Sequence, residues 1–516
     1  MSRRRVLLLV GSDVTSDARV RKCAESLRRA QYDVRVLFTL NRPTSRGEFP
    51  PHLDGTPIEE LAPPTLTTRP TQPIPQGIIK TIRTGGGFAT PVRRQRAVHG
   101  AKLRGRELAA RIAVRKLRLA EIPRSSRLAA RLDLKVRTWL AHLAIRADRS
   151  RLKARREFLR YRLARTATGS ASSPFQSSGE APLHRRDARA NWRRRLPDLA
   201  AMDLVFGPRI DELEPDVLHV HDYHLLPTAA EATVRARAAG RDVKLVYDAH
   251  EFVRGLTTLH DERRRAIAGT ERRFMRDADA VITVSIALAD RLEEDHGCAR
   301  PTVVMNAPRQ LPPDVGASTS LRKECGIADD VPLLVYSGNI TPARGVHTLI
   351  EALGLLSRSV HLALVTNGRA RYLDELLDRA VELGIRDRLH LAPYVPVDEV
   401  PAYLREATVG VHPLLHYPNA EIALPNKIFE YAHARIPVVV SDCRAQAAFV
   451  KRWGFGEVFA ADDPSDLSRA VSQVLEDPQT YRSFLTDEVL DELSWEGQEP
   501  ALLSLYERLL APTATP

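Results

Sequence analysis

The helix expected after Pro425 carries residue types that bind phosphate and hydroxyl groups. Asn426 and Glu430 are four positions apart and Lys427 and Glu430 are three apart, so all three share one helical face. We expect Pro425 at the first helical position, where its missing N–H costs nothing, after a loop over 419–424. Free backbone N–H groups and the macrodipole at a helix start favour an anion. A nucleotide sugar, with phosphates at one end and hydroxyls nearby, would suit this face.

The chain length and the cysteine spacing limit the class of protein. A chain of 516 residues is too long for one ordinary core, so we expect two or three domains. The four cysteines have no CxxC spacing, which argues against a zinc site or a disulfide framework and fits a reducing compartment. The apolar run 6–10 is too short for a signal peptide, and no run approaches the ~18 residues of a membrane helix. We therefore expect a cytoplasmic protein.

The positive charge is concentrated in one segment. Residues 80–195 hold 32 Lys and Arg against 7 Asp and Glu, a net of +25, which leaves −12 on the rest of a chain whose total is +13. Within this segment, 93–165 reads as two or more helices rich in Ala, Leu and Arg. The segment and the chain that carries it therefore need separate explanations.

Three uses of the basic segment remain open. It contacts the anionic inner face of a membrane through 90–165, or it binds an anionic polymer such as nucleic acid, or it is a solvated helical insert whose helices pack on the host domain. We expect no nucleic acid, because few aromatic residues are interleaved to stack on bases. One helical face, flanked by Lys and Arg, would suit a membrane surface; it comprises Val136, Trp139, Leu140 and Leu143.

Strands and helices alternate in two series, which predicts an α/β fold with two Rossmann-like, doubly wound domains. The prolines of 41–76 predict a loop with little regular structure. We expect an N-terminal domain over 1–310 with the basic helical insertion at about 80–195, a second domain over 325–490, and a final helix within 491–516 that packs back on the first domain. The expected strands are 5–10, 33–38, 217–220, 243–247, 280–284, 302–305, 333–336, 361–366, 388–392, 408–412, 437–441 and 456–459.

An ordered set of motifs carries a family resemblance. In the second half they are 335–339 with Arg344-Gly345, 364–368, 390–394 and 424–441. In the first half they are DARVRKCAESLRRAQYDV, DVLHVHDYH, YDAHEF, ADAVITVS and VVMNAP. Apart from the basic insertion, the chain resembles the retaining GT-B glycosyltransferases called glycosyl transferases group 1, or family four. The family has two Rossmann-like domains that face a cleft, with the nucleotide sugar bound by the second.

The resemblance implies roles for the second domain. Arg344 and Lys427 would neutralise the diphosphate as it leaves, and Glu430 would accept hydrogen bonds from the ribose hydroxyls. The reaction would retain configuration and need no metal, with no cofactor beyond the UDP- or GDP-linked donor. Asp277-Ala278-Asp279 matches a metal-binding DxD pattern, but such pairs are frequent by chance. The remaining implied donor contacts are Gly338, Asn339, Gly368, Tyr394, Glu421, Ile422 and Asn426.

The resemblance also implies a catalytic group and an acceptor side in the first domain. His250 follows a predicted strand and matches the sugar-facing histidine of the family, at the sheet edge where ligands bind. The acceptor itself, a glycan, a lipid-linked or a small molecule of cell-envelope or polysaccharide synthesis, is unknown. The acceptor-side candidates are Gly11, Asp17, Arg19, His221, Asp222 and Glu251.

The chain departs from the family pattern at two positions. With Glu430 as the second acid of the Glu, seven residues, Glu motif, the first acid falls on Ile422, and Glu421 is one position out of register. Asn339 stands where many members have arginine. Two other functions on the same fold therefore stay open: a nucleotide-sugar 2-epimerase, and a catalytically inactive scaffold that binds nucleotide sugars.

Overall fold

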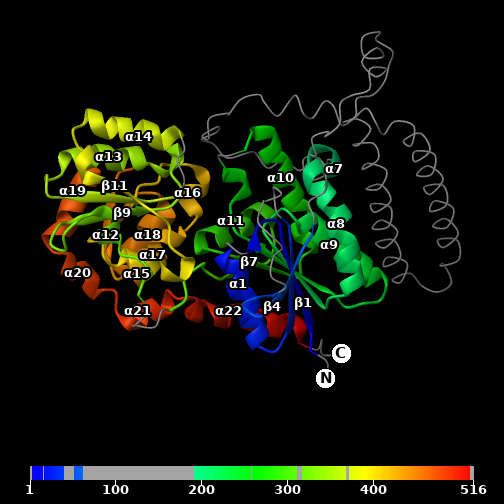
Figure 1. The fold of residues 1–516 in the computed structure, drawn as a ribbon. Coiled ribbons are helices and arrows are strands. Elements are labelled where there is room, and N and C mark those ends of the chain that lie inside the picture. Colours follow the sequence, from blue (N-terminus) through cyan, green and yellow to red (C-terminus); the bar gives the residue numbers. More distant parts are fainter. Residues whose placement is uncertain are drawn as a thin grey trace, which may run out of the picture. The chain divides into compact units, whose positions relative to one another are not determined.

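The computed structural model describes residues 3–14, 17–39, 52–61, 191–256, 259–310, 316–367 and 371–511. The helices predicted for 93–165, and with them the membrane face, lie outside the described residues, as does Gly368. The described chain contains two sheets with helices packed on them (Figure 1). The strands and helices predicted outside the basic segment can therefore be compared with the observed ones.

The first sheet has the strand order β3-β4-β2-β1-β5-β6-β7-β8. The printed pairings are parallel except that of β3 with β4. Because β2 and β5 lie on opposite sides of β1, the order changes direction beside β1, which is where open α/β sheets bind ligands. The strands are β1 (Arg5–Val10), β2 (Asp33–Phe38), β3 (His52–Leu53), β4 (Thr56–Glu60), β5 (Val217–His221), β6 (Lys244–Ala249), β7 (Ala280–Thr283) and β8 (Thr302–Val303).

The second sheet has six parallel strands in the order β11-β10-β9-β12-β13-β14. Its direction changes between β9 and β12, so the carboxyl ends of these two strands form its expected ligand edge. The strands are β9 (Leu333–Ser337), β10 (His361–Val365), β11 (Leu389–Ala392), β12 (Val409–His412), β13 (Val438–Ser441) and β14 (Gly456–Phe459).

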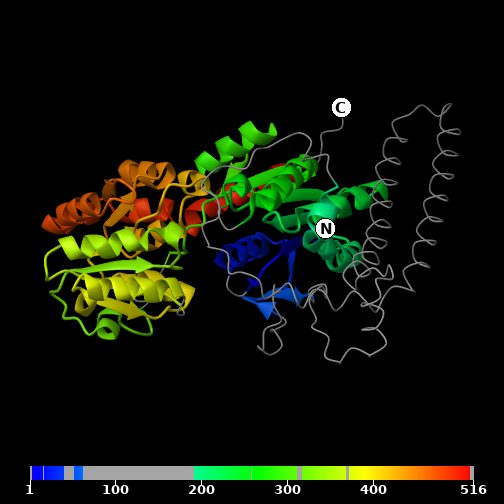
Figure 2. The same ribbon diagram turned by 90° about the horizontal axis from the view of Figure 1, so that it is seen from above.

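Helices alternate with the strands along the chain. Buried apolar residues of several helices pack on the second sheet, and Figure 2 shows the same elements from above. The helices are α1 (Ala18–Arg29), α7 (Trp192–Arg195), α8 (Pro197–Leu213), α9 (Leu226–Ala238), α10 (Asp261–Phe274), α11 (Ile286–His296), α12 (Leu321–Cys325), α13 (Val346–Leu355), α14 (Arg371–Glu382), α15 (Val400–Leu404), α16 (Pro418–Ile422), α17 (Asn426–His433), α18 (Arg444–Trp453), α19 (Pro464–Glu476), α20 (Pro478–Ser483), α21 (Asp487–Glu492) and α22 (Trp495–Leu510).

Two apolar layers enclose the second sheet, because alternate side chains of each strand point to opposite faces. Leu334 and Tyr336 of β9 join the layer formed with α13, α14 and α19. Leu333 and Val335 join the layer formed with α12, α15, α17 and α18. A sheet buried on both faces fixes its strand register, so the residues at its carboxyl edge are held on a rigid base.

The described residues divide into two compact units. The first holds 3–14, 17–39, 52–61, 191–248 and 266–280, and the second holds 249–256, 259–265 and 281–511 apart from its undescribed gaps. Within the second unit, Gln498 of α22 accepts a hydrogen bond from Met305 N at 3.1 Å. The domain boundaries expected from the sequence stay a prediction. Among the described helices, none combines the length and apolarity needed to cross a membrane.

Three local expectations were wrong. The proline-rich stretch 41–76 contains the hairpin β3–β4, turned by Asp54 and Gly55, whose positive φ values of 51° and 74° fit a two-residue hairpin. The loop expected over 419–424 begins with the short helix α16. Pro425 is the N-cap of α17 rather than its first residue, and it has an extended ψ of 137°.

A close backbone approach at Gly345 generates a prediction about stability. Gly345 has φ +67°, and a Cβ there would lie 1.7 Å from the carbonyl oxygen of Pro413. Gly345→Ala should lower the unfolding midpoint in denaturant, because αL strain of about 1–2 kcal/mol adds to a clash that moves the Pro413 loop.

Gly354 in the same helix region provides the matched control. A Cβ at Gly354 would meet nothing within 4 Å, so Gly354→Ala should be neutral or stabilising by up to about 1 kcal/mol. Equal midpoints for the two variants would contradict the assigned close approach.

Candidate functional site

Helix α17 presents Lys427 and Glu430 side by side, as the helical spacing predicted. Lys427 Nζ lies 2.9 Å from Glu430 Oε2 and 3.2 Å from Oε1, and the side chains are 27% and 12% exposed. Asn426 is exposed at the first helical position. Ile428 and Phe429 on the other face are buried in the core. The packing therefore holds a cation and a carboxylate at the first turns of the helix.

Packing against β9 and β12 brings Lys427 to the ligand edge of the second sheet. Tyr431 of α17 accepts a hydrogen bond from Ser337 N at 3.1 Å. Its ring lies over Gly410, where a Cβ would be 2.6 Å away. Gly338 follows β9 with φ +145°, and a Cβ there would lie 3.6 Å from Lys427 Cε. The predicted glycine turn and the predicted lysine helix therefore lie together.

Arg344 supplies a second cation near this edge. It ends the 3₁₀ turn Pro342–Arg344 and is half-buried. No ion pair of Arg344 is recorded with any other described residue. Burial raises the pKa of Tyr336 and of Tyr417, and the charge of Arg344 is the main effect opposing each rise. Arg344 is thus a cation close to polar rings and without a carboxylate partner in the described chain.

The other implied donor contacts lie at the ends of neighbouring strands. Tyr394 follows β11, is half-buried and bonds Thr366 after β10; burial raises its pKa. Asn339 is exposed, and its carbonyl oxygen accepts a hydrogen bond from the Tyr336 hydroxyl at 2.7 Å. The carboxyl edge of the second sheet therefore collects these residues as the motif order predicted, apart from the undescribed Gly368.

His412 was missed in the sequence and lies in the same place. It ends β12, is 2% exposed, and its ring is stacked on Tyr336 with centroids 6.4 Å apart. Its Nδ1 lies 2.9 Å from Gln446 Oε1. The pKa of His412 is lowered to about 3, chiefly by burial; the hydrogen bond with Gln446 opposes this shift, and the charges of Arg344 and Lys427 add to it. The ring is therefore neutral, and the only sequence signal for it was a histidine at a predicted strand end.

Glu421 and Ile422 lie on α16. Ile422 is 7% exposed and buried. Glu421 Oε1 accepts from His416 Nδ1 at 2.5 Å, and Oε2 accepts from Arg444 N at 3.0 Å. Neither residue is bonded to Lys427 or Glu430 within the described structure. Glu421 is thus held by the protein itself and does not pair with Glu430, although the two acids are close in sequence.

Arg19 does not face an acceptor, which corrects the expectation from the sequence. It is 1% exposed, and its Nε and Nη2 lie 2.8 and 2.9 Å from the two oxygens of Asp248. Burial alone would lower the pKa of Arg19; the charge and hydrogen bonds of Asp248 outweigh it, so the pKa is raised. Asp17 caps α1 by accepting from Arg19 N and Val20 N. Both residues therefore have structural partners.

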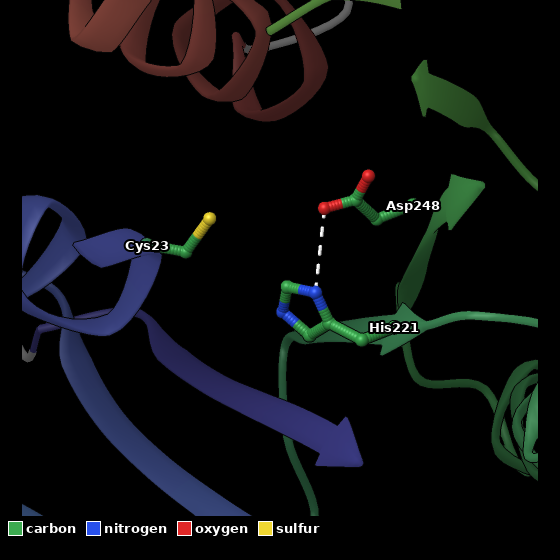
Figure 3. A group of neighbouring side chains, drawn as sticks. All are labelled: Cys23, His221 and Asp248. Carbon is green, nitrogen blue, oxygen red and sulfur yellow. Dashed lines mark ion pairs between the residues drawn. The ribbon is translucent and has the colours of Figure 1, made fainter. Parts of the chain in front are cut away.

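His221 is also buried rather than exposed to an acceptor. Its Nδ1 lies 3.3 Å from Asp248 Oδ2, and its ring is stacked on His219 with centroids 4.4 Å apart. Figure 3 shows His221 and Asp248 directed toward each other, with Cys23 of α1 nearby. His221, Asp248 and Cys23 present the atom types of a metal site within 4.8 Å of one another.

The chemistry of this cluster does not fit a metal ion. Burial raises the pKa of Cys23 to about 12, so its sulfur is a neutral thiol. The guanidinium of Arg19 already neutralises Asp248 from 2.8 Å.

The DxD pattern at 277–279 has a structural role at its second acid. Asp279 accepts a hydrogen bond from Leu245 N at 2.7 Å and forms an ion pair with Arg237.

The other residues predicted from the first half of the chain differ in exposure, and Gly11 among them is buried. His250 and Glu251 directly follow β6; His250 is half-buried and Glu251 is exposed. Asp222 follows β5 with φ +61° and accepts from Tyr223 N at 2.8 Å. A Cβ at Gly11 would lie 2.8 Å from the Cβ of His224, so this glycine makes room for a side chain of the protein. The donor-sugar contact of His250 and the acceptor roles of Gly11, Asp222 and Glu251 stay predictions.

Comparisons with known proteins agree with this geometry. Residues 318–486 match the model described as Glycosyl transferases group 1, and 166–307 match Glycosyltransferase Family 4. Sucrose-phosphate synthase from Thermosynechococcus elongatus is similar over 99% of this chain and 100% of that one, with TM-score 0.61 and 15% identity. Anabaena HepE in complex with UDP and glucose is similar over 98% and 100%, with TM-score 0.57 and 13% identity. The chain therefore has the GT-B fold, and each of its two matched regions is of a glycosyltransferase type.

Curated relatives match shorter regions. A GDP-mannose-dependent alpha-(1-6)-phosphatidylinositol monomannoside mannosyltransferase of Mycolicibacterium smegmatis is 28% identical over 40% of this chain and 56% of its own length. The lipopolysaccharide core biosynthesis glycosyltransferase LpsE of Rhizobium meliloti is 28% identical over 35% of this chain and 50% of its own length. The chain spans about half the length of these relatives.

The buried pair in the first unit generates a prediction. Arg19→Met should lower the free energy of unfolding by about 3–5 kcal/mol, because Asp248 is left as an uncompensated buried charge. Urea unfolding followed by fluorescence and circular dichroism measures the loss.

Arg21 on the same helix is the matched control. Its ion pair with Asp54 is 2.7 Å long but 24% and 37% exposed. Arg21→Met should therefore cost no more than about 1 kcal/mol. A loss for Arg19→Met as small as that for Arg21→Met would overturn the structural role of the buried pair.

Proposed function

We propose that the chain is a glycosyltransferase that moves a sugar from a nucleoside-diphosphate donor held at the carboxyl edge of the second sheet. The observation that carries this proposal is the cation pair at that edge, in which Arg344 has no carboxylate partner among the described residues. Lys427 adds a charge beside the Gly338 turn. Two cations at one sheet edge match the two phosphates of such a donor.

In this proposal, Lys427 changes partner when the donor binds. Its ammonium leaves the Glu430 carboxylate and faces a phosphate oxygen, which frees both Glu430 oxygens to accept from ribose hydroxyls. His412, whose pKa both cations lower, stays neutral, so it adds no positive charge and keeps one ring nitrogen as an acceptor. As the bond to the anomeric carbon breaks, negative charge grows on the leaving diphosphate, and Arg344 and Lys427 stabilise it.

The finer points of the reaction belong to the same proposal. Retention of configuration and a sugar contact by His250 rest on the resemblance of the sequence motifs. UDP- and GDP-sugars are the first donors to test, because HepE was solved with UDP and glucose and the Mycolicibacterium relative is named for GDP-mannose. The relatives named for lipopolysaccharide core and phosphatidylinositol mannoside support a cell-envelope acceptor.

A donor panel tests the proposal against its two rivals. Incubation with UDP-, GDP- and ADP-sugars should give slow hydrolysis alone and transfer when acceptors are added. Epimerisation of the sugar would support the 2-epimerase, and binding without any turnover would support an inactive scaffold.

The cations and the ribose carboxylate can be tested separately. Lys427→Ala should lower kcat/KM for the donor about 100-fold, because one charge on the leaving diphosphate is lost. Glu430→Gln should chiefly raise KM, since ribose binding is present before and during the reaction. Lys451→Ala on α18, an exposed residue, is the control and should behave as wild type. Full activity of both site variants would remove the assignment.

Metal independence has its own test. Because Arg344 and Lys427 would do the work of a divalent cation, turnover should be unchanged by EDTA and by added Mg²⁺ or Mn²⁺. Loss of turnover in EDTA, restored by a divalent ion, would contradict this part of the proposal.

A further inference from the structure

One segment connects the two cations of the proposed site. Residues 413–425, here called the bridging segment, run from the end of β12 to the start of α17. Near its start, Leu415 N donates to Ala343 O at 3.2 Å, and Pro413 O lies where a side chain of Gly345 would be. The segment thus contacts the turn of Arg344 at one end and leads into Lys427 at the other. The segment therefore links the surroundings of the two cations.

The start of the bridging segment is anchored to the end of β13. Ser441 Oγ donates to Leu414 O at 2.6 Å and accepts from Gln446 Nε2 at 2.7 Å. The thiol of Cys443 donates to Leu415 O at 3.5 Å. These bonds fix the first residues, but they do not reach α16 in the middle of the segment.

A histidine between two carboxylates anchors the middle. His416 Nδ1 lies 2.5 Å from Glu421 Oε1 on α16, and His416 Nε2 lies 2.9 Å from Asp442 Oδ1 after β13. Glu421 Oε2 accepts from Arg444 N at the start of α18, and Asp442 Oδ1 accepts from Ala461 N, both at 3.0 Å. The three side chains therefore join the bridging segment to two other parts of the domain.

The geometry fixes the charge of His416. Ionised carboxylate oxygens only accept hydrogen bonds, so both ring nitrogens must carry hydrogens, and the ring is an imidazolium. The charged groups that face it are Glu421 of α16 and Asp442 after β13, while Arg444 of α18 lies on the far oxygen of Glu421. The hydrogen bond that His416 donates to Glu421, the largest cause, raises the pKa of His416 against a smaller opposing effect of burial.

We propose that His416, Glu421 and Asp442 form a clamp that positions the bridging segment, and through it Arg344 and Lys427, to bind the diphosphate of a nucleotide sugar. This inference rests on the proposed function. It gives Glu421 a role despite its displaced register: the carboxylate holds the segment and does not contact the sugar. A metal ion does not fit here, because both ring nitrogens of His416 are already directed at carboxylates.

The clamp makes donor binding depend on pH. The pKa of His416 is raised in the folded protein. The charged ring therefore stabilises the bridging segment fully below the ordinary pKa of about 6.5, and this stabilisation is lost as pH rises through the raised pKa. Above that pKa, one ring nitrogen presents a lone pair to a carboxylate, and one of the two contacts is repulsive. The segment is then held at fewer points, and the spacing of the cations is less well defined.

The first experiment observes the ring itself. In protein with ¹⁵N-labelled histidine, the two ring nitrogens of His416 should both be protonated at pH about 7, where an ordinary histidine is mostly neutral. Assignment comes from comparison with His416→Gln. A neutral His416 ring at this pH would overturn the clamp, whatever the donor-binding results.

The second experiment measures binding of UDP-, GDP- and ADP-sugars by calorimetry from pH about 6 to about 8.5, a range in which the diester phosphates keep a constant charge. Wild type should bind the preferred donor about tenfold more weakly at the upper end, which corresponds to the loss of one charge-assisted contact. His416→Gln should bind weakly at both ends with little pH dependence, because an amide cannot donate to two carboxylates on opposite sides.

Two further variants complete the test. Glu421→Gln should also remove the pH dependence while keeping a hydrogen bond to Arg444 N, which guards against a variant that fails to fold. His361→Gln is the control, since His361 begins β10 at the opposite edge of the sheet and bonds His390 at 2.9 Å; its pH profile should match wild type.

The outcomes separate the clamp from the proposed function. If wild type binds a nucleotide sugar and His416→Gln shows the same affinity and pH profile, the clamp is wrong and the function stands. If wild type binds none of the nucleotide sugars at any pH, the proposed function fails, and the positioning role fails with it.

Discussion

The approach of Gly345 to the carbonyl oxygen of Pro413 is the constraint on which the carboxyl edge of the second sheet depends. No side chain fits between them, so the turn that ends in Arg344 lies against the backbone that leaves β12. The two strands that precede these segments, β9 and β12, are neighbours on either side of the point where the strand order reverses. A parallel sheet brings its carboxyl ends to one edge, and the glycine allows two of the loops there to meet.

The groups around Arg344 and Lys427 favour an anion at this edge because they are either neutral or already paired. The carboxylate near Lys427 comes from the same helix and can be exchanged, whereas Glu421 is occupied by His416 and Arg444 N. Tyr336 and Tyr394 have raised pKa values, so they remain neutral hydroxyls, and His412 remains a neutral ring. The buried groups thus add polarity without adding charge, which leaves Arg344 as the dominant charge that a ligand meets.

Much of the site followed from the sequence, because it depends on short-range rules. Spacing along one helix placed Lys427 beside Glu430, and the family resemblance pointed to Gly338 and Tyr394, which follow predicted strands. The errors involve partners that are distant in the chain. Arg19 and Asp248 are 229 residues apart, and no local pattern shows that an arginine in a helix will be buried. Likewise, the sequence showed that Glu421 is one position away from the motif's first acid, but it could not show the bond to His416, which depends on how α16 folds. The hairpin β3–β4 had a local signal, Asp54-Gly55, which was outweighed by the surrounding prolines.

The buried ion pair of the first unit has a consequence for anyone who recombines this protein with its relatives. Arg19 lies near the start of the chain and Asp248 at the end of β6, so a crossover anywhere between them takes each residue from a different parent. A hybrid that inherits only one of the two would carry a single charge in a site closed to water. Exchange of segments of the first unit is therefore safest when the parents share this pair, or when both residues move together as one block.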